Sequence, residues 1–122
     1  MALRCLIVDD SESFLAAARD LLERGGLIIE GVASTSAEAL ERAAASRPDV
    51  VLVDIFLGEE SGFDLARRLV EQDGSRSTVI LISTHSEADL ADLIAASPAA
   101  GFVPKAELSA AAVKQLANGH SE

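Results

Sequence analysis

The stretch LRCLIVDDSE, residues 3–12, decides the fold, because a run of apolar residues ends there in two adjacent carboxylates. Leu6, Ile7 and Val8 are continuously apolar, as in a strand that helices cover on both faces. Asp9 and Asp10 follow side by side, where their like charges repel each other. Taken alone, one of them could cap a helix and the other could lie in a solvated turn. The rest of the sequence has to explain why the pair stands at the end of a buried strand.

Similar apolar runs alternate with Ala- and Leu-rich segments of helical period. The expected strands are 3–8, 27–33, 50–54, 79–83 and 101–104. The expected helices are 12–24, 35–46, 61–72, 86–97 and 109–118. Each helix has a Ser, Thr or Asp at its start, and Thr35 with Glu38 forms a capping-box pattern. This alternation predicts an α/β fold, a doubly wound (βα)5 unit with a five-stranded parallel sheet.

Composition bounds the protein class. The 122 residues are 49% hydrophobic, which suits one globular domain over 1–122, and no linker or composition break divides them. A net charge of −10 argues against direct nucleic-acid binding through a basic face. No apolar run approaches the ~20 residues that span a membrane, and no signal-peptide pattern is present. We therefore expect a cytoplasmic protein, with the lone Cys5 as a buried, inert thiol.

The carboxyl ends of the strands carry the polar residues of interest. In open α/β sheets, ligands bind beyond these ends. Asp9 and Asp10 follow the first strand, Asp54 ends the third, Ser83 ends the fourth and Lys105 follows the fifth. Each one alone could be a cap or a solvated loop residue. Clustered carboxylates repel unless a cation offsets them, and such oxygen ligands suit Mg²⁺. The set predicts Mg²⁺-assisted phosphoryl transfer with an aspartate nucleophile.

The motifs that hold these residues are VDD at 8–10, LVDIFL at 52–57, SG at 61–62, LIST at 81–84 and FVPK at 102–105. In this order and spacing the chain resembles, over essentially its whole length, the CheY-like receiver domain of two-component response regulators. The resemblance implies a flavodoxin-like strand order 2-1-3-4-5. It also implies a phosphoacceptor signalling domain rather than an enzyme, with self-catalysed phosphorylation and dephosphorylation.

By this resemblance Asp54 is the phosphoacceptor. Its donor would be the phosphohistidine of a sensor histidine kinase or phosphotransfer protein, or a small molecule such as acetyl phosphate. Asp10 would bind Mg²⁺ directly and Asp9 mostly through water. Asp54 and the backbone carbonyl of Phe56 would complete the metal site. Lys105 would pair with Asp54 and then with the phosphoryl oxygens.

The resemblance also implies a switch. Ser83 would donate its hydroxyl to the phosphoryl group, and Phe102 would turn inward into the space that Ser83 vacates, although an ordinary core Phe explains Phe102 as well. The fourth helix, fifth strand and fifth helix would form the face that controls a downstream protein, and phosphorylation could promote a homodimer.

Several positions depart from the usual pattern or tune it. Ala106 follows Lys105 where many receivers have Pro, so we expect a trans peptide bond there. Gly58 stands where Pro is common, and Ser83 replaces the commoner Thr while keeping the hydroxyl. Phe56 and His85 should flank the path of a water that attacks the phosphoryl group, and a partly solvated loop His is the alternative for His85.

The sequence also bears on four alternative functions. We expect no output domain in this chain, and the alternative is a receiver cut from a longer DNA-binding regulator, since FVPKAEL resembles receivers of that kind. A Mg²⁺-dependent phosphohydrolase of the haloacid dehalogenase type would need a second Asp where Phe56 stands. A nucleotide-binding domain would need a G-x-G-x-x-G or P-loop motif, and neither is present. A receiver-like fold that signals without phosphorylation is disfavoured because every site residue is present.

Overall fold

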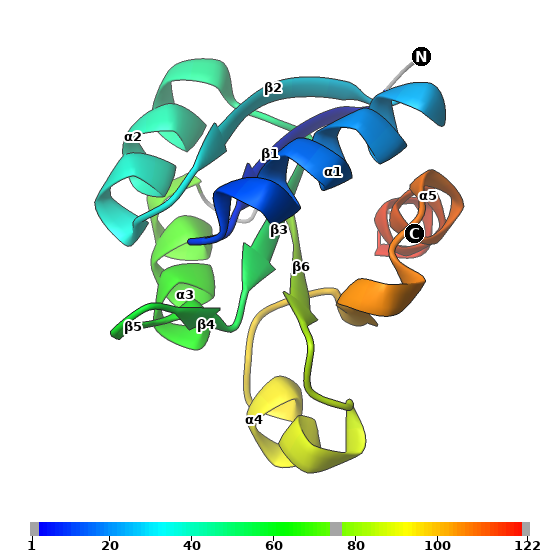
Figure 1. Cartoon of the computed structure of the whole chain (residues 1–122). Helices are drawn as coiled ribbons and strands as arrows, with labels where there is room; N and C mark the ends of the chain where they lie inside the picture. The colour runs from blue at the N-terminus through cyan, green and yellow to red at the C-terminus, as the bar shows by residue number, and fades with distance from the viewer. Residues whose placement is uncertain (1–2, 74–76, 121–122) are drawn as a thin grey trace.

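The computed structural model describes residues 3–73 and 77–120 of the chain. One parallel sheet runs through its centre in the order β2-β1-β3-β6-β7 (Figure 1). The strands are β1 (Arg4–Val8), β2 (Ile28–Ala33), β3 (Val50–Asp54), β6 (Thr78–Ser83) and β7 (Gly101–Pro104). Because β6 and β7 are the fourth and fifth parallel strands, this is the predicted order 2-1-3-4-5. The predicted bounds hold for β3 and β7 and differ by one residue at the start of the others.

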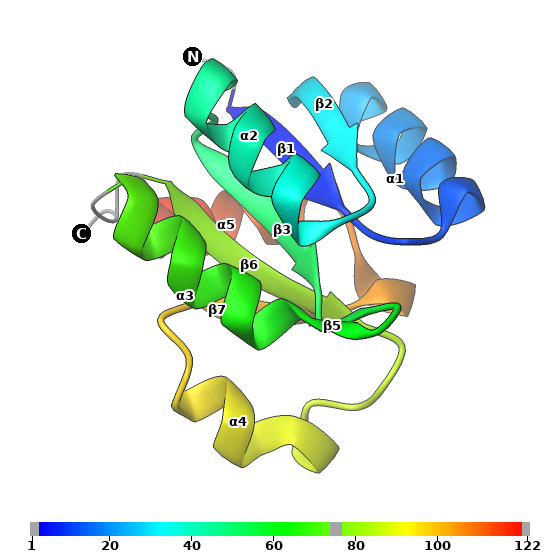
Figure 2. The ribbon, with the colours of Figure 1, turned by 90° about the vertical axis from the view of Figure 1, so that its left-hand side faces the viewer.

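Helices cover both faces of the sheet (Figures 1 and 2). The helices are α1 (Glu12–Arg24), α2 (Ser36–Ser46), α3 (Gly62–Asp73), α4 (Ala91–Ala95) and α5 (Ala110–His120). The pair α1 and α5 buries one apolar cluster against the sheet, and the pair α2 and α3 buries another on the opposite face. The doubly wound fold is therefore confirmed.

The strand β1 shows why its sequence is continuously apolar. Cys5 and Ile7 belong to the cluster beneath α1 and α5, whereas Leu6 and Val8 belong to the cluster beneath α2 and α3. Successive side chains of a strand point to opposite faces, so both faces must be apolar when both are covered. After Arg4 this arrangement leaves no solvated face on β1, and the next polar side chain is that of Asp9.

Side-chain caps begin α1 and α2 where the sequence predicts them. The Ser11 hydroxyl accepts a hydrogen bond of 3.3 Å from the backbone N–H of Phe14 at the start of α1. The Thr35 hydroxyl accepts one of 3.2 Å from the Glu38 N–H. The Glu38 carboxylate reaches back to the Ser34 N–H at 2.8 Å, one residue before the cap. The capping box therefore forms with its second half shifted by one residue.

The fourth helix is shorter than predicted. Instead of one helix over 86–97, a 3-10 turn (Ala88–Leu90) precedes α4, and the backbone between them leaves the α conformation at Leu90, with φ −120° and ψ 11°. Leu90 and Ile94 pack against the cluster beneath α2 and α3. The helix stops two residues before Ser97, which precedes Pro98, a position that disfavours the α conformation.

Two smaller differences concern the segment after β3 and the last helix. A two-stranded antiparallel hairpin, β4 (Phe56–Leu57) and β5 (Glu60–Ser61), follows β3 and was not predicted. Gly58 lies in its turn with a φ of +60°, a conformation that glycine adopts without strain. The α5 helix continues to His120, past the predicted end near 118.

Two further observations bear on the sequence predictions. The peptide bonds of the described residues contain no cis bond, so the bond from Lys105 to Ala106 is trans as predicted. Among the helices of residues 3–73 and 77–120, none is long and apolar enough to cross a membrane.

Candidate functional site

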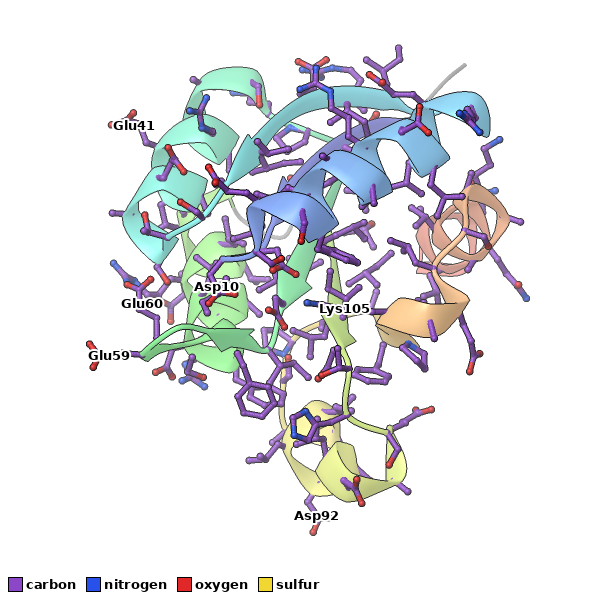
Figure 3. All side chains as sticks on the ribbon, viewed as in Figure 1. Asp10, Glu41, Glu59, Glu60, Asp92 and Lys105 are labelled. Carbon is purple, nitrogen blue, oxygen red and sulfur yellow. The ribbon has the colours of Figure 1, made fainter. Side chains whose placement is uncertain are left out.

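The sheet order brings the ends of β1 and β3 side by side. Val8 is the register partner of Val53, so Asp9 and Asp54 come next on adjacent strands. Carboxylate oxygens of Asp9, Asp10 and Asp54 all lie within 4.8 Å of one another. Figure 3 shows Asp10 and Lys105 at this same edge of the sheet. The predicted cluster of carboxylates therefore forms at the topological switch point.

The adjacent aspartates differ in environment. Asp9 has an exposed fraction of 0%, whereas Asp10 is exposed. The Asp9 Oδ1 atom accepts a hydrogen bond of 2.8 Å from the Ser11 N–H, and its Oδ2 atom lies 2.6 Å from the Lys105 Nζ atom. Asp9 is thus fixed inside the domain, and Asp10 meets the solvent from which a cation would arrive.

Asp54 is nearly as buried as Asp9, with 5% exposed. Its Oδ1 atom accepts a hydrogen bond of 3.2 Å from the Phe56 N–H, and its Oδ2 atom lies 3.4 Å from Lys105 Nζ. Burial and then the charge of Asp9 raise the pKa of Asp54 to about 6, although Lys105 and the Phe56 N–H act in the opposite direction. The site therefore holds a carboxylate whose charge is only partly offset.

Lys105 bridges the two buried aspartates. Burial alone would lower its pKa, but the hydrogen bonds and charges of Asp9 and Asp54 outweigh burial and raise the pKa above its ordinary value. The ammonium is therefore charged at neutral pH. The Phe14 ring also contacts it, with 4.4 Å between Lys105 Nζ and the ring centroid. Sequence reasoning missed Phe14, which in the sequence is only an apolar residue on the first turn of a helix.

A glycine explains the SG motif at 61–62. A Cβ atom on Gly62 would lie 2.2 Å from the backbone carbonyl oxygen of Asp54, far inside van der Waals contact. The Gly62 N–H donates a hydrogen bond of 2.7 Å to the Ile55 carbonyl. The first turn of α3 therefore packs directly on the backbone of Asp54, and only glycine leaves room for it.

Ser83 is fully buried at the end of β6. Its hydroxyl makes no hydrogen bond with Asp54 in the described part of the chain. Within the described residues its hydroxyl accepts a hydrogen bond of 3.0 Å from the His85 N–H and lies 3.5 Å from the His85 Nδ1 atom. The structure thus brings together Asp9, Asp10, Asp54 and Lys105, while the Ser83 hydroxyl is engaged with the following loop.

The two Phe residues singled out in the sequence differ in their surroundings. The Phe56 ring is 48% exposed, and its centroid is 4.7 Å from that of the His85 ring, so these residues are neighbours as expected. Phe102 is partly buried and packs against the apolar cluster beneath α2 and α3. Its register partner on β6 is Leu81, two residues before Ser83.

The donor set fits a hard divalent cation. Its ligand atoms are carboxylate oxygens, one carboxylate is exposed, and the other two are buried with a single lysine bridging them. Such ions take several oxygen ligands and keep some of their waters, which the exposed position of Asp10 allows. The cluster is therefore a site that could bind a metal ion.

Fold and site together define a doubly wound α/β domain with an acidic, lysine-bridged site at its switch point. The chain belongs to the response regulator receiver domain family, whose model matches residues 5–117. Receiver domains are signalling domains that interact with kinases and downstream effectors, and they are generally not enzymes in the usual sense.

Named relatives agree with this family. The chain is 36% identical over 123 residues to the DNA-binding transcriptional activator DevR/DosR of Mycobacterium tuberculosis, covering 97% of this chain and 56% of that protein. It is 28% identical over 105 residues to the chemotaxis protein CheY of Thermotoga maritima, covering 86% and 87% of the two chains.

Solved structures agree as well. The signal receiver domain of the putative response regulator NarL of Mycobacterium tuberculosis superposes with a TM-score of 0.84 and 30% identity, covering 97% of this chain and 98% of that one. The chain spans only 22% to 56% of the length of several curated relatives, including DevR/DosR. What those longer proteins do as a whole therefore does not follow for this chain.

Proposed function

We propose that the chain is a phosphoacceptor in which Asp54 receives a phosphoryl group from a phosphohistidine. The observation that carries the proposal is the buried Asp54 carboxylate, which Lys105 contacts and whose pKa the charge of Asp9 raises. An Asp54 oxygen forms the new O–P bond while the P–N bond to the donor imidazole breaks, and the imidazole nitrogen keeps the electron pair and takes up a proton. With acetyl phosphate, a P–O bond breaks and acetate leaves.

The metal in this proposal is Mg²⁺. Asp10 would bind it directly and Asp9 mostly through water, and Asp54 and the Phe56 carbonyl would complete the protein ligands. When bound, Mg²⁺ offsets the negative charge of the carboxylates and of the phosphoryl oxygens. The carboxylate oxygens within 4.8 Å of one another support this assignment.

Lys105 and Ser83 act on the phosphoryl group in this proposal. Lys105 moves from Asp54 Oδ2 to a phosphoryl oxygen, a short displacement because both lie at the same carboxylate. Ser83 leaves the His85 N–H, donates its hydroxyl to the phosphoryl group and vacates space that Phe102 fills. This shifts the population of the α4–β7–α5 face between two conformations. Phe56 and His85 flank the approach of the water that ends the signal.

The partners follow from this role. A sensor histidine kinase or phosphotransfer protein supplies the phosphoryl group, and a downstream protein or a second copy of the chain reads the altered face. The net charge of −10 supports a chain that does not itself bind nucleic acid. We propose a cytoplasmic location and one receiver domain over residues 1–122.

A second candidate is the receiver portion of a longer DNA-binding regulator. The observation that favours it is the similarity to DevR/DosR, described as a DNA-binding transcriptional activator, of which this chain spans 56%. The intact mass of the protein purified from its own source separates the two candidates, because only the second predicts a longer chain.

Intact mass spectrometry after incubation with acetyl phosphate tests the phosphoacceptor role. The expected result is one added phosphoryl group with Mg²⁺, none with EDTA, and none in Asp54→Asn under either condition. Asp64→Asn, an exposed aspartate on α3, is the control that should be labelled like wild type. Labelling of Asp54→Asn to the wild-type extent would refute the assignment of Asp54.

A further inference from the structure

Phe14 contacts the lysine of the site from a helix that carries none of the proposed chemistry. Its ring centroid lies 4.4 Å from Lys105 Nζ, within the distance at which a cation is attracted to an aromatic face. We propose that Phe14 is a positioning residue, which holds the Lys105 ammonium where it can serve Asp54. The proposal rests on the phosphoacceptor function argued above.

Phe14 is itself held in place relative to Asp9. The Asp9 carboxylate accepts a hydrogen bond of 2.8 Å from the Ser11 N–H, and the Ser11 hydroxyl accepts one of 3.3 Å from the Phe14 N–H. The Phe14 side chain is partly buried and packs against the apolar cluster beneath α1 and α5. The two hydrogen bonds and this packing therefore hold the Phe14 ring in a fixed position relative to the buried Asp9.

Lys105 needs such a restraint because its contacts with the two aspartates are unequal. Its Nζ atom lies 2.6 Å from Asp9 Oδ2 but 3.4 Å from Asp54 Oδ2. A lysine side chain is a point charge on a flexible four-carbon stem, so its closer partner can draw it away from the other. The ring occupies another side of the ammonium and limits that movement.

An aromatic ring suits this task better than a polar side chain. A further carboxylate would add to the repulsion among Asp9, Asp10 and Asp54, and a hydroxyl would offer the ammonium a competing hydrogen bond. The face of the ring attracts the ammonium through its quadrupole without adding net charge and without bringing water. The ammonium can then turn its N–H groups toward Asp9 and Asp54.

The contact can be measured in the Mg²⁺-free protein, independently of phosphorylation. The sequence contains only two lysines, Lys105 and Lys114, so their side-chain signals are separable in ¹H–¹³C NMR spectra. Lys114 donates a hydrogen bond of 2.8 Å to the Gly25 carbonyl, away from the site, and serves as the internal reference. The Lys105 methylene protons should show an upfield ring-current shift in wild type and Phe14→Tyr. They should lose it in Phe14→Leu and Phe14→Met, while Lys114 stays unchanged.

The functional arm is the phosphorylation rate from acetyl phosphate at saturating Mg²⁺. Phe14→Leu and Phe14→Met should be slower by a factor of about 3 to 10, with Phe14→Tyr close to wild type and Mg²⁺ affinity unchanged. Leu and Met keep the apolar bulk but lack the ring, whereas Tyr keeps the ring. Comparing the three variants therefore separates the effect of the aromatic ring from the effect of packing.

Each outcome decides the proposal. An unchanged Lys105 signal in both ringless variants would overturn the contact. A lost shift with a wild-type rate, or a Tyr variant as slow as Leu, would overturn the positioning role. If wild type itself takes no phosphoryl group, the phosphoacceptor function fails and the positioning role with it. The NMR shift would still report whether the ring holds the lysine.

Discussion

At the scale of single residues, the main feature is the repulsion among three close carboxylates, those of Asp9, Asp10 and Asp54. Two of the carboxylates are buried, and Lys105 is the cation that contacts both of them. The raised pKa of Asp54, to about 6, shows that its surroundings favour the neutral form despite that lysine. The Mg²⁺-free protein therefore keeps an unfavourable charge at the position where the proposed chemistry needs it.

The first prediction concerns Asp54 and pH in the absence of Mg²⁺. Because the folded-state pKa of about 6 exceeds the ordinary value of 3.8, the folded protein holds this proton more tightly than the unfolded chain. The contribution of Asp54 to stability is therefore full below the ordinary pKa and is lost as pH rises through the folded-state value. Near pH 3.8, the ordinary pKa, Asp54→Asn should have the same free energy of unfolding as wild type. Above pH 6, the folded-state pKa, it should be more stable than wild type by up to about 3 kcal/mol.

Urea unfolding in EDTA across this pH window measures the difference in the free energy of unfolding. Asp92→Asn, an exposed aspartate on α4, is the control and should follow the wild-type curve. A stability difference for Asp54→Asn that does not grow with pH would contradict the assigned charge state.

A second prediction separates Asp10 from Asp9. Asp10 is exposed and Asp9 is buried against Lys105, so Asp10→Ala removes like-charge repulsion without stranding the lysine. The variant should be at least as stable as wild type in EDTA. It should also bind Mg²⁺ more weakly, by about tenfold or more, because losing even a residue that only orients a metal ligand can weaken binding that much. Isothermal titration calorimetry and thermal unfolding measure both effects, with Glu41→Ala on α2 as the control. A clear loss of stability in EDTA would count against the picture of crowded carboxylates.

At the scale of elements, the hairpin after β3 links the site to α2. The Glu60 carboxylate of β5 accepts a hydrogen bond of 2.9 Å from the backbone N–H of Ser36, the first residue of α2. A carboxylate at a helix N-terminus is favourable because the unpaired N–H groups and the helix dipole both attract negative charge. The segment that follows Asp54 is therefore tied to a second helix as well as to α3.

The third prediction tests this link. Glu60→Gln keeps the size of the side chain but removes its charge, so it should lower the free energy of unfolding by about 0.5 to 1 kcal/mol. Glu59→Gln, at the adjacent exposed position of the same hairpin, is the matched control and should change stability much less. Equal effects of the two substitutions in urea unfolding would mean that the Ser36 bond adds nothing beyond the general surface charge.

The elements also show what sequence patterns could and could not predict. The strands and most helix starts were predictable because each depends on a local signal, such as the apolar run before Asp9 or the Ser11 cap. The break in the helix at Leu90 was not predictable, because it depends on how Leu90 and Ile94 pack against the core. The hairpin at Gly58 was missed because its strands are only two residues long and carry no periodic signal.

The same division holds within the site. Asp9, Asp10, Asp54 and Lys105 were predictable as neighbours because parallel strands bring their carboxyl ends to one edge. The bond from the His85 N–H to Ser83 and the ring of Phe14 over Lys105 were not, because both depend on side-chain rotamers. The roles of Phe102 and of the α4–β7–α5 face stay predictions.

At the scale of the whole molecule, both the net charge and the acidic site affect the response to cations. The chain carries −10, and three of its carboxylates converge on one site, so a bound divalent ion should stabilise the folded state over the unfolded chain. The site, rather than the general charge, should account for most of this effect because its oxygens are already close together.

The fourth prediction follows. Mg²⁺ at about 100 times its dissociation constant should raise the free energy of unfolding of wild type by about 2.7 kcal/mol, and tenfold weaker binding in Asp10→Ala should reduce that gain to about 1.4 kcal/mol or less. Thermal unfolding at matched ionic strength, with NaCl replacing MgCl₂, removes the contribution of general screening. If NaCl raised the free energy of unfolding as much as MgCl₂ does, the stabilisation would come from screening of the surface charge and not from binding at the site.

The most direct measurement of the central claim is a ¹H–¹⁵N NMR titration with beryllofluoride, which mimics a phosphoryl group on an aspartate. With Mg²⁺ present, we expect saturable changes in the amide signals around Asp54, at Ser83 and His85, and along β7. We expect no such changes without Mg²⁺ or in Asp54→Asn. A wild-type spectrum that does not respond, or an Asp54→Asn spectrum that responds in the same way, would contradict Mg²⁺-dependent phosphorylation of Asp54.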